Sequence, residues 1–150
     1  RPLGLFREYW LSPGEMAAHF QGDWYLTGDR ATRDADGYFW FIGRNDDVIK
    51  SSGYRIGPFE VESVLLEHPA VLEAAVIGKP DPLRGQIVKA FVVLRPGIEP
   101  ADELKATLQM HCKRLVANYK YPREVEFVPE LPKTASGKTR HVALRQAAHA

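Results

Sequence analysis

Hydrophobic residues in the second half of the chain follow strand-like and helix-like patterns in turn. Val71–Gly78 and Ile87–Leu94 are apolar, β-branched runs with the length of buried strands. Between Ala101 and about Ala117 the apolar residues recur at helical spacing, which predicts an amphipathic helix. The apolar stripe of this helix consists of Leu104, Leu108, Cys112 and Leu115.

Proline and acidic residues mark another helix ahead of these strands. It is expected to begin near Pro58, to carry Glu60 and Glu62 in its first turn, and to end at Pro69. The remaining elements predicted toward the C-terminus are a short strand at Glu124–Val128 and a helix at Thr139–Ala148.

Turn signals predict two β-hairpins in the first part of the chain. An Asp-Gly pair joins Arg30–Arg33 to Gly37–Gly43, and a Ser-Ser-Gly turn joins Asp47–Lys50 to Tyr54–Ile56. From the second hairpin onward, strands mix with helices. The predicted fold class is therefore α+β: a small domain with this hairpin and a mixed three-stranded sheet, flanked by about three helices.

Residues 1–30 have a different character. Glycines, prolines and scattered aromatic residues dominate them, which indicates loops, short strands and a short helix near Glu15–Phe20. Such a segment has little periodic core of its own. We therefore expect it, together with the first hairpin, to belong to a different body from the α+β domain.

Composition narrows the class of protein. The 150 residues are 45% hydrophobic, with 20 Lys and Arg against 19 Asp and Glu, so the chain can build a core and is neither a nucleic-acid coat nor a polybasic membrane anchor. One cysteine, Cys112, excludes an internal disulfide or a cysteine-based zinc site. No apolar run approaches membrane-spanning length. The start at Arg1, with no leader pattern, is expected to be the middle of a longer protein.

Two turns carry candidate binding residues. Asp29 follows Gly28, and an Asp beside a Gly can direct its carboxylate at paired hydroxyls such as those of a ribose. The backbone amides near Gly53, with Arg55 two residues later, suit a phosphate or a carboxylate. The alternatives are an ordinary turn aspartate and a hairpin with surface charges.

A lysine near the C-terminus is the third candidate. The string Gly137-Lys138-Thr139 resembles the end of a nucleotide P-loop, but the first glycine of that motif would stand at the position of Pro132. What remains is Lys138 on a Ser-Gly loop before a helix, where a flexible ammonium can reach a phosphate. The alternative is a solvated loop lysine.

Basic and aromatic residues are interleaved in the last third of the chain, in a pattern that fits a phosphorylated nucleotide whose base can stack. Ordinary solvated surfaces are the alternative. The five histidines are isolated and show no metal-ligand spacing. The interleaved residues are Arg84, Lys113, Lys120 and Arg123 with Tyr119 and Tyr121.

The order and joint occurrence of three motifs give the chain a family resemblance. YLTGD, then GRNDDVIKSSGYRIGPFEVE, then PKTASGKTR resemble the adenylate-forming enzymes: acyl-CoA synthetases, adenylation domains of peptide synthetases, and luciferases. Within the family, SSGYRIGPFEVE, DPLRGQIVKAFVVL and YKYPREVEFV look most like medium-chain or aryl acyl-CoA synthetases. Peptide-synthetase domains usually carry a Gln and an Arg-Gly pair where this chain has Val48 and Ser52-Gly53.

The resemblance implies two domains and a role for each of several residues. Residues 1–44 would be the last strands of a large N-terminal domain that holds ATP and the acid, and residues 45–150 would be a lid that rotates about Asp46. Asp29, helped by Arg44, would bind the ribose of AMP. Lys138 would be the catalytic lysine of adenylation, reaching the α-phosphate and the acyl carboxylate.

After rotation, other residues would serve thioester formation. Arg55 would lie near the acyl-adenylate, and the CoA-binding residues would be Ser52, Gly53, Tyr54, Arg84, Lys113, Tyr121, Pro122 and Arg123. The implied substrates are a carboxylic acid, ATP with Mg²⁺, and coenzyme A. The implied partner is the large domain, and the compartment is the cytoplasm, or the mitochondrial matrix if the source is eukaryotic.

Two alternatives stay open at this stage. The acceptor thiol could belong to an acyl carrier protein, although the bases Arg84, Lys113 and Arg123 favour free CoA with its extra phosphates. The chain could also be a binding or regulatory module without catalysis, against which the presence of Asp29, Arg44 and Lys138 counts.

The chain alone is expected to be inactive, because the phosphate-binding loop and the acyl pocket of the family are not among its residues. The acid itself is not specified by this sequence.

Overall fold

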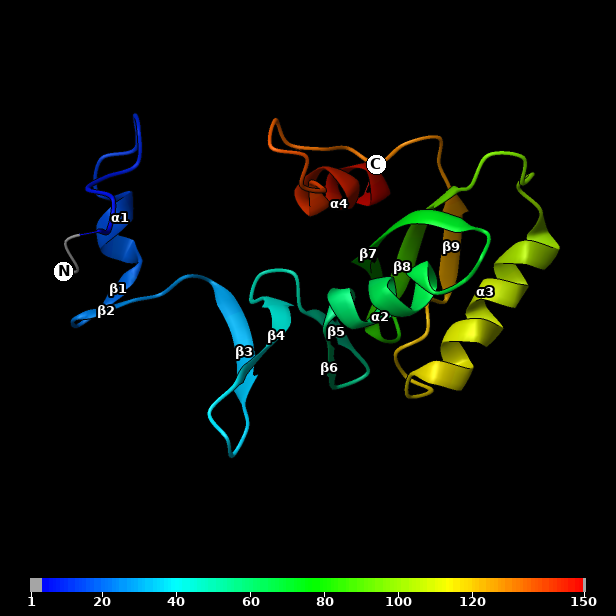
Figure 1. The fold of residues 1–150 in the computed structure, drawn as a ribbon, viewed down its shortest axis with the longest axis horizontal. Coiled ribbons are helices and arrows are strands. Elements are labelled where there is room, and N and C mark those ends of the chain that lie inside the picture. Colours follow the sequence, from blue (N-terminus) through cyan, green and yellow to red (C-terminus); the bar gives the residue numbers. More distant parts are fainter. Residues whose placement is uncertain (1–3, 150) are drawn as a thin grey trace.

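The computed structural model describes residues 4–149 (Figure 1). Arg1-Pro2-Leu3, the start of the first predicted segment, lies outside the described residues. The elements follow the order predicted from the sequence, with most boundaries shifted by a few residues. They are α1 (Glu15–Ala18), β1 (Phe20–Gln21), β2 (Trp24–Tyr25), β3 (Asp29–Arg33), β4 (Phe39–Arg44), β5 (Ile49–Ser51), β6 (Tyr54–Ile56), α2 (Pro58–Leu66), β7 (Val71–Asp81), β8 (Gly85–Leu94), α3 (Asp102–Leu115), β9 (Glu124–Phe127) and α4 (His141–His149).

Three strands form the mixed sheet that the sequence predicts. β7 and β8 pair antiparallel from Val71 with Leu94 to Asp81 with Gly85, and β9 pairs in parallel with β8. The β5–β6 hairpin, expected as a separate unit, joins this sheet through the pairing of Ser51 with Gly85. The domain is therefore built on one five-stranded sheet.

Helices cover both faces of the sheet. Because side chains alternate along a strand, Val88, Ala90 and Val92 face α2 and α3, while Phe91 and Val93 face α4. Figure 1 shows α2 and α3 next to each other beside the sheet, and α4 on its own near the C-terminus. The two apolar layers explain why β7 and β8 read as nearly continuous hydrophobic runs.

The connection between β7 and β8 differs from the prediction. The predicted strands end at Gly78 and begin again at Ile87, but both strands continue into the segment between them, and only a short turn remains between Asp81 and Gly85. Pro80 is compatible with a strand here because β7 pairs only with β8, so its missing N–H interrupts no second ladder.

The stripe of α3 is also corrected at one end. Leu108 and Cys112 are buried and Leu104 packs against the core, but Leu115 is 53% exposed. The step from Cys112 to Leu115 is three residues rather than four, and Val116 packs against the core instead. Burial raises the pKa of the Cys112 thiol to about 11, so this cysteine is an inert core residue.

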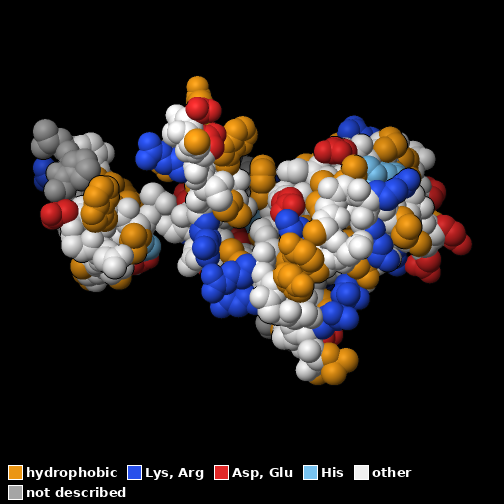
Figure 2. All heavy atoms as spheres, turned by 90° about the horizontal axis from the view of Figure 1, so that it is seen from below, with side chains coloured by type: hydrophobic (Ala, Val, Ile, Leu, Met, Phe, Trp, Pro, Cys, Tyr) orange, Lys and Arg blue, Asp and Glu red, His pale blue; other side chains and the backbone are white. Residues whose placement is uncertain are grey.

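The segment before β5 has almost no core. β1–β2 and β3–β4 are two separate two-stranded sheets, and Met16 is the one buried hydrophobic side chain among residues 4–44. Figure 2 shows hydrophobic side chains on the surface of this part of the molecule. Across the described residues, none of the helices combines the length and the apolar character that crossing a membrane requires. The large exposed residues of the segment include Trp10, Trp24, Tyr38, Phe39, Trp40 and Phe41.

Two adjacent leucines of α2 offer a test of the packing. Leu65 is fully buried, whereas Leu66 is 47% exposed. Leu65→Ala should lower the free energy of unfolding by about 2–5 kcal/mol, because it leaves a cavity in the core. Leu66→Ala, the matched control, should change it by no more than about 0.5 kcal/mol. Urea denaturation of the chain measures both, and equal losses would contradict the assigned orientation of α2.

Candidate active-site cavity and coenzyme face

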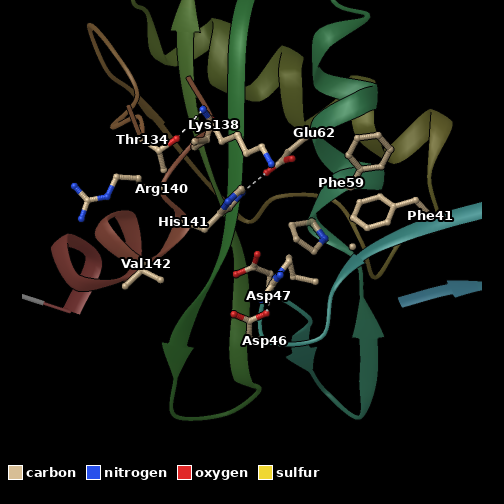
Figure 3. A pocket seen from close by; sticks show the side chains of 14 residues that line it. Phe41, Asp46, Asp47, Phe59, Glu62, Thr134, Lys138, Arg140, His141 and Val142 are labelled. Atoms are coloured by element: carbon tan, nitrogen blue, oxygen red, sulfur yellow. Dashed lines mark hydrogen bonds and ion pairs between the residues drawn. The ribbon is translucent and has the colours of Figure 1, made fainter. Parts of the chain in front are cut away.

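A cavity of about 920 Å³ lies where the end of β4, the start of α2 and the loop before α4 meet (Figure 3). It brings together residues that are far apart in the sequence, including three predicted site residues, Arg44, Asp46 and Lys138. The residues lining it are Phe41, Gly43, Arg44, Asp46, Asp47, Pro58, Phe59, Glu62, Thr134, Lys138, Thr139, Arg140, His141 and Val142.

Lys138 is carried on a tight turn. The N–H of Lys138 donates to Thr134 Oγ1 at 3.1 Å, and the N–H of Thr134 donates to the Lys138 carbonyl at 2.8 Å. Gly137 has φ 84°, a left-handed conformation that glycine adopts without strain. The Lys138 ammonium has no hydrogen-bond or ion-pair partner among the described residues, so it is available to an anion in the cavity.

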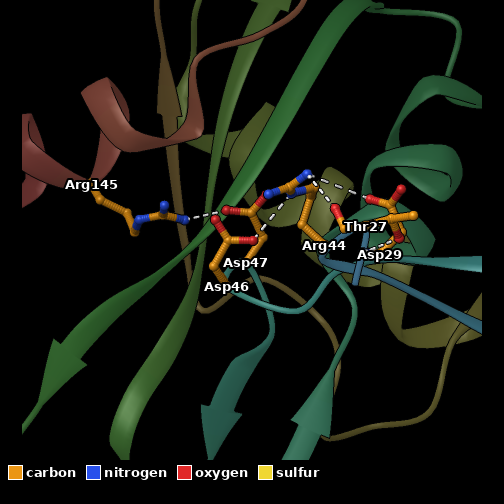
Figure 4. A network of polar contacts seen from close by, with 6 residues as sticks. All are labelled: Thr27, Asp29, Arg44, Asp46, Asp47 and Arg145. Carbon is orange, nitrogen blue, oxygen red and sulfur yellow. Dashed lines mark hydrogen bonds and ion pairs between the residues drawn. The ribbon is translucent and has the colours of Figure 1, made fainter. Parts of the chain in front are cut away.

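Arg44 is the centre of a polar network at the other side of the cavity (Figure 4). Its guanidinium lies 3.7 Å from Asp29 Oδ1 and 3.2 Å from Asp46 Oδ1, and it donates to the Thr27 carbonyl at 3.4 Å. Gly28 allows this approach, since a Cβ there would lie 3.0 Å from Arg44 Nη2. The groups are about half exposed, so these contacts orient the side chains more than they stabilise the fold.

The two consecutive aspartates after β4 point to different partners. Asp46 accepts a hydrogen bond from Arg44, two residues earlier, whereas Asp47 binds Arg145 of α4. Figure 4 shows Arg44 and Arg145 approaching this pair from opposite sides. Asp46 is therefore bound to a residue of the first hairpin, whereas the next residue, Asp47, is bound to a residue of the α+β domain.

His141 and Glu62 form a partly buried ion pair in the cavity wall. His141 Nε2 donates to Glu62 Oε1 at 2.8 Å, and the same oxygen accepts the N–H of Val76 at 2.8 Å. The hydrogen bond to Glu62 raises the pKa of His141 above its ordinary 6.5, against the opposing effect of burial. No sequence signal identified this pair, because its members are 79 residues apart and His141 looked like an isolated histidine.

The predicted coenzyme residues gather around the β5–β6 turn. Ser52 and Gly53 occupy this turn with φ 49° and 84°. Arg84 is joined to it twice: its carbonyl accepts the Ser52 N–H at 2.9 Å and its guanidinium donates to Ser52 Oγ at 3.1 Å. Tyr54 stacks on Tyr119, with ring centroids 4.1 Å apart. The hairpin and the loop after α3 thus form one surface.

A second aromatic group extends this surface. The Lys113 ammonium lies 4.3 Å from the centre of the Tyr121 ring, and the Arg123 guanidinium lies 5.2 Å from it. The prediction for Pro122 is corrected, because this residue is fully buried and has no surface to offer a ligand. Arg55 is exposed on β6 and has no hydrogen-bond or ion-pair partner among residues 4–149.

The predicted site residues therefore fall into two groups that lie apart. Figure 1 shows the loop that carries Lys138 near α4, at the opposite end of the domain from the β5–β6 turn. Arg44, Asp46 and Lys138 line the cavity, with Asp29 beside Arg44, while the coenzyme residues lie at the other end. Residues 4–149 contain no group of three or more His, Cys, Asp or Glu side chains that could hold a metal ion.

Comparison with known proteins identifies the family. The family described as "AMP-binding enzyme C-terminal domain" matches residues 60–138, more than half of the chain, and the chain belongs to it. This confirms the resemblance drawn from the motifs. Human mitochondrial acyl-coenzyme A synthetase ACSM5 is 60% identical over 147 residues, which are 97% of this chain and 25% of that protein.

Solved structures agree with this assignment. An acyl-CoA synthetase from Brucella canis is 56% identical with a TM-score of 0.69, covering 87% of this chain and 24% of that one. The anthranilate CoA ligase AuaEII, solved with anthranoyl-AMP, is 50% identical with a TM-score of 0.80, covering 87% and 25%. The chain thus spans about a quarter of the length of the proteins it matches.

The His141–Glu62 pair predicts a pH dependence of stability. Because the pKa of His141 is raised on folding, its contribution is fully present below pH 6.5 and is lost as the pH rises through the folded-state value. The free energy of unfolding should therefore fall more steeply above pH 6.5 in the chain than in a His141→Gln variant. Denaturant titrations at several pH values test this, and parallel curves for the two proteins would contradict it.

Proposed function

We propose that this chain is the C-terminal part of an AMP-forming acid–CoA ligase, which converts a carboxylic acid, ATP and CoA to acyl-CoA, AMP and pyrophosphate. The observation that carries the proposal is the cavity that gathers an unpaired lysine, Lys138, with Arg44 and Asp46. Membership of the AMP-binding enzyme family and the acyl-CoA synthetase names of the relatives support it.

In the adenylation half-reaction, Lys138 is the catalytic residue. The acid carboxylate attacks the α-phosphate of ATP, and pyrophosphate leaves. A mobile ammonium on a tight loop neutralises the negative charge that concentrates between the two reacting groups, which is an electrostatic and positioning role. Asp29 accepts hydrogen bonds from the ribose hydroxyls, and Arg44, already in contact with Asp29, orients that carboxylate.

We propose that the hinge is Asp46 and that the domain boundary falls between residues 44 and 45. Support comes from the two aspartates: Asp46 is tied back to Arg44, while Asp47 is tied to Arg145 in the lid. Residues 4–44 also bury a single hydrophobic side chain and expose many aromatic ones, as expected for strands that pack on a large N-terminal domain. A lid that turns at this point can present different groups to one reaction centre.

In the thioester half-reaction, the other end of the lid faces the acyl-adenylate. Ser52, Gly53 and Tyr54 line the path of the pantetheine arm, and Arg55 lies near the adenylate. The bases Arg84, Lys113 and Arg123, with the Tyr121 ring between two of them, bind the phosphates and base of CoA. The opposite placement of this surface and the Lys138 loop is what makes a rotation necessary.

The remaining partners follow from this assignment. The large N-terminal domain holds ATP and the acid, and it supplies the ligands of the Mg²⁺ that accompanies ATP. The relatives ACSM3 and ACSM5 carry the description "mitochondrial", and we place this enzyme in the mitochondrial matrix as well, with the cytoplasm as the alternative for a bacterial source. The 150-residue chain alone forms no acyl-CoA.

Replacing the lysine tests the core of the proposal. In the full-length enzyme, Lys138→Ala should slow pyrophosphate release on adenylation by about 100- to 1,000-fold, the range seen when one electrostatic contact to a transition state is removed. Transfer to CoA from supplied acyl-adenylate should stay within a few-fold. Equal loss of both half-reactions would show that the role of Lys138 is misassigned.

A second set of variants distinguishes free CoA from a carrier protein as the thiol. Neutralising Arg84, Lys113 and Arg123 together should raise the KM for CoA by at least about tenfold, because each charged contact to phosphate contributes roughly 1–3 kcal/mol. Adenylation should be unaffected. Lys120→Gln is the matched control, since Lys120 is already paired with Glu60. An unchanged KM in the triple variant would favour an acyl carrier protein.

A further inference from the structure

The ion pair between His141 and Glu62 has no part in the chemistry proposed above, yet it lies in the same cavity wall as Lys138. The side chains of the pair are 21% and 15% exposed, so it is shielded from solvent more than most ion pairs of this chain. His141 follows Lys138 by only three residues and begins α4. Figure 3 shows the side chains of His141, Glu62 and Lys138 converging on one side of the cavity.

The loop that carries Lys138 is closed at its base. The N–H of Arg140 donates to the Pro132 carbonyl at 2.8 Å, and Lys133 bridges to Thr139 across the loop. The direction of the whole loop therefore depends on what holds this base. A change in the orientation of the base therefore also moves the Lys138 side chain at the tip of the loop.

Two ion pairs attach the base to the rest of the domain, in addition to the packing of Leu131 and Leu144 in the core. On one side Lys133 binds Glu73 of β7 at 2.8 Å, but this pair is 44% and 35% exposed and contributes little. On the other side His141 binds Glu62, whose oxygen is fixed in turn by the N–H of Val76. Glu62 thus joins α2, β7 and α4 at one atom.

We propose that His141 is a positioning residue for adenylation: by donating to Glu62, it fixes the base of the loop so that Lys138 enters the cavity. The proposal deepens the proposed function and depends on the catalytic role assigned to Lys138. His141 itself touches no substrate. Its effect is expected in adenylation alone, because the surface for the thioester step lies at the opposite end of the lid.

Protonation makes this device sensitive to pH. Charged His141 holds Glu62 more strongly than neutral His141 does, so positioning is best below the raised pKa of His141 and weakens as the pH rises through it. The acidic neighbours strengthen the protonated form and the basic ones oppose it. Glu62 on α2, Asp47 before β5 and Arg145 on α4 act directly on His141, and the other charged groups that line the same cavity are Arg44 at the end of β4, Asp46 before β5, and Lys138 and Arg140 on the loop.

The test compares both half-reactions of the full-length enzyme across pH. His141→Gln should lower the single-turnover rate of adenylation about 10- to 100-fold, the range that a displacement of roughly 1 Å can cause. His141→Arg, which keeps a charge at every pH, should restore the rate and remove its decline above pH 6.5. Thioester formation from supplied acyl-adenylate shows in the same samples that the lid is folded. Lys133→Gln, which breaks the exposed anchor, is the matched control.

The outcomes separate this inference from the function on which it rests. Selective loss of adenylation in His141→Gln, with a flat pH profile in His141→Arg, supports it. Equal loss of both half-reactions, or an unchanged pH profile in His141→Arg, overturns it while Lys138→Ala remains inactive in adenylation. If Lys138→Ala adenylates normally, the proposed function and this inference fail together.

Discussion

The antiparallel pairing of β7 with β8 is the constraint on which the α+β domain depends. The ladder runs without a break in its second half, from Ala74 to Gly85, and its side chains alternate between two buried faces. Two buried faces need two layers of cover, and α2 with α3 on one side and α4 on the other provide them. Every other element of the domain is positioned by attachment to this pair of strands: β9 along β8, and the β5–β6 hairpin at Gly85.

This arrangement also sets the distance between the two candidate working surfaces. The loop with Lys138 leads into α4, whereas the turn with Ser52 and Gly53 is attached near the end of β8. A rigid sheet keeps the two apart, so both cannot reach one reaction centre at once. A domain that presents one end and then the other turns this rigidity into an ordered sequence of two reactions, which is the physical basis of the proposed rotation.

Polar side chains form specific contacts between elements that the packing of the apolar layers does not fix. Glu62 ties α2, β7 and α4 together, and Arg145 ties α4 to Asp47 at the start of the domain. Just before this second anchor, Asp46 is bound to Arg44 and remains 60% exposed. The chain is therefore held on both sides of a short, exposed junction, which is where we propose the hinge. In the proposed mechanism, the same anchors also direct the lysine loop toward the cavity.

Local patterns in the sequence determined the class of fold, the order of the elements and the family, because hairpin turns, the proline at the start of α2 and the three motifs are short-range signals. They also identified Asp29, Arg44 and Lys138 as candidates, while their roles remain proposals. Tertiary structure alone decided that Pro80 lies in a strand, since only the edge position of β7 leaves its missing N–H harmless. It alone exposed Leu115, buried Pro122 and paired His141 with Glu62 and Arg145 with Asp47. Those contacts join residues 79 and 98 positions apart, and no local spacing can specify which side chains a folded sheet will bring face to face.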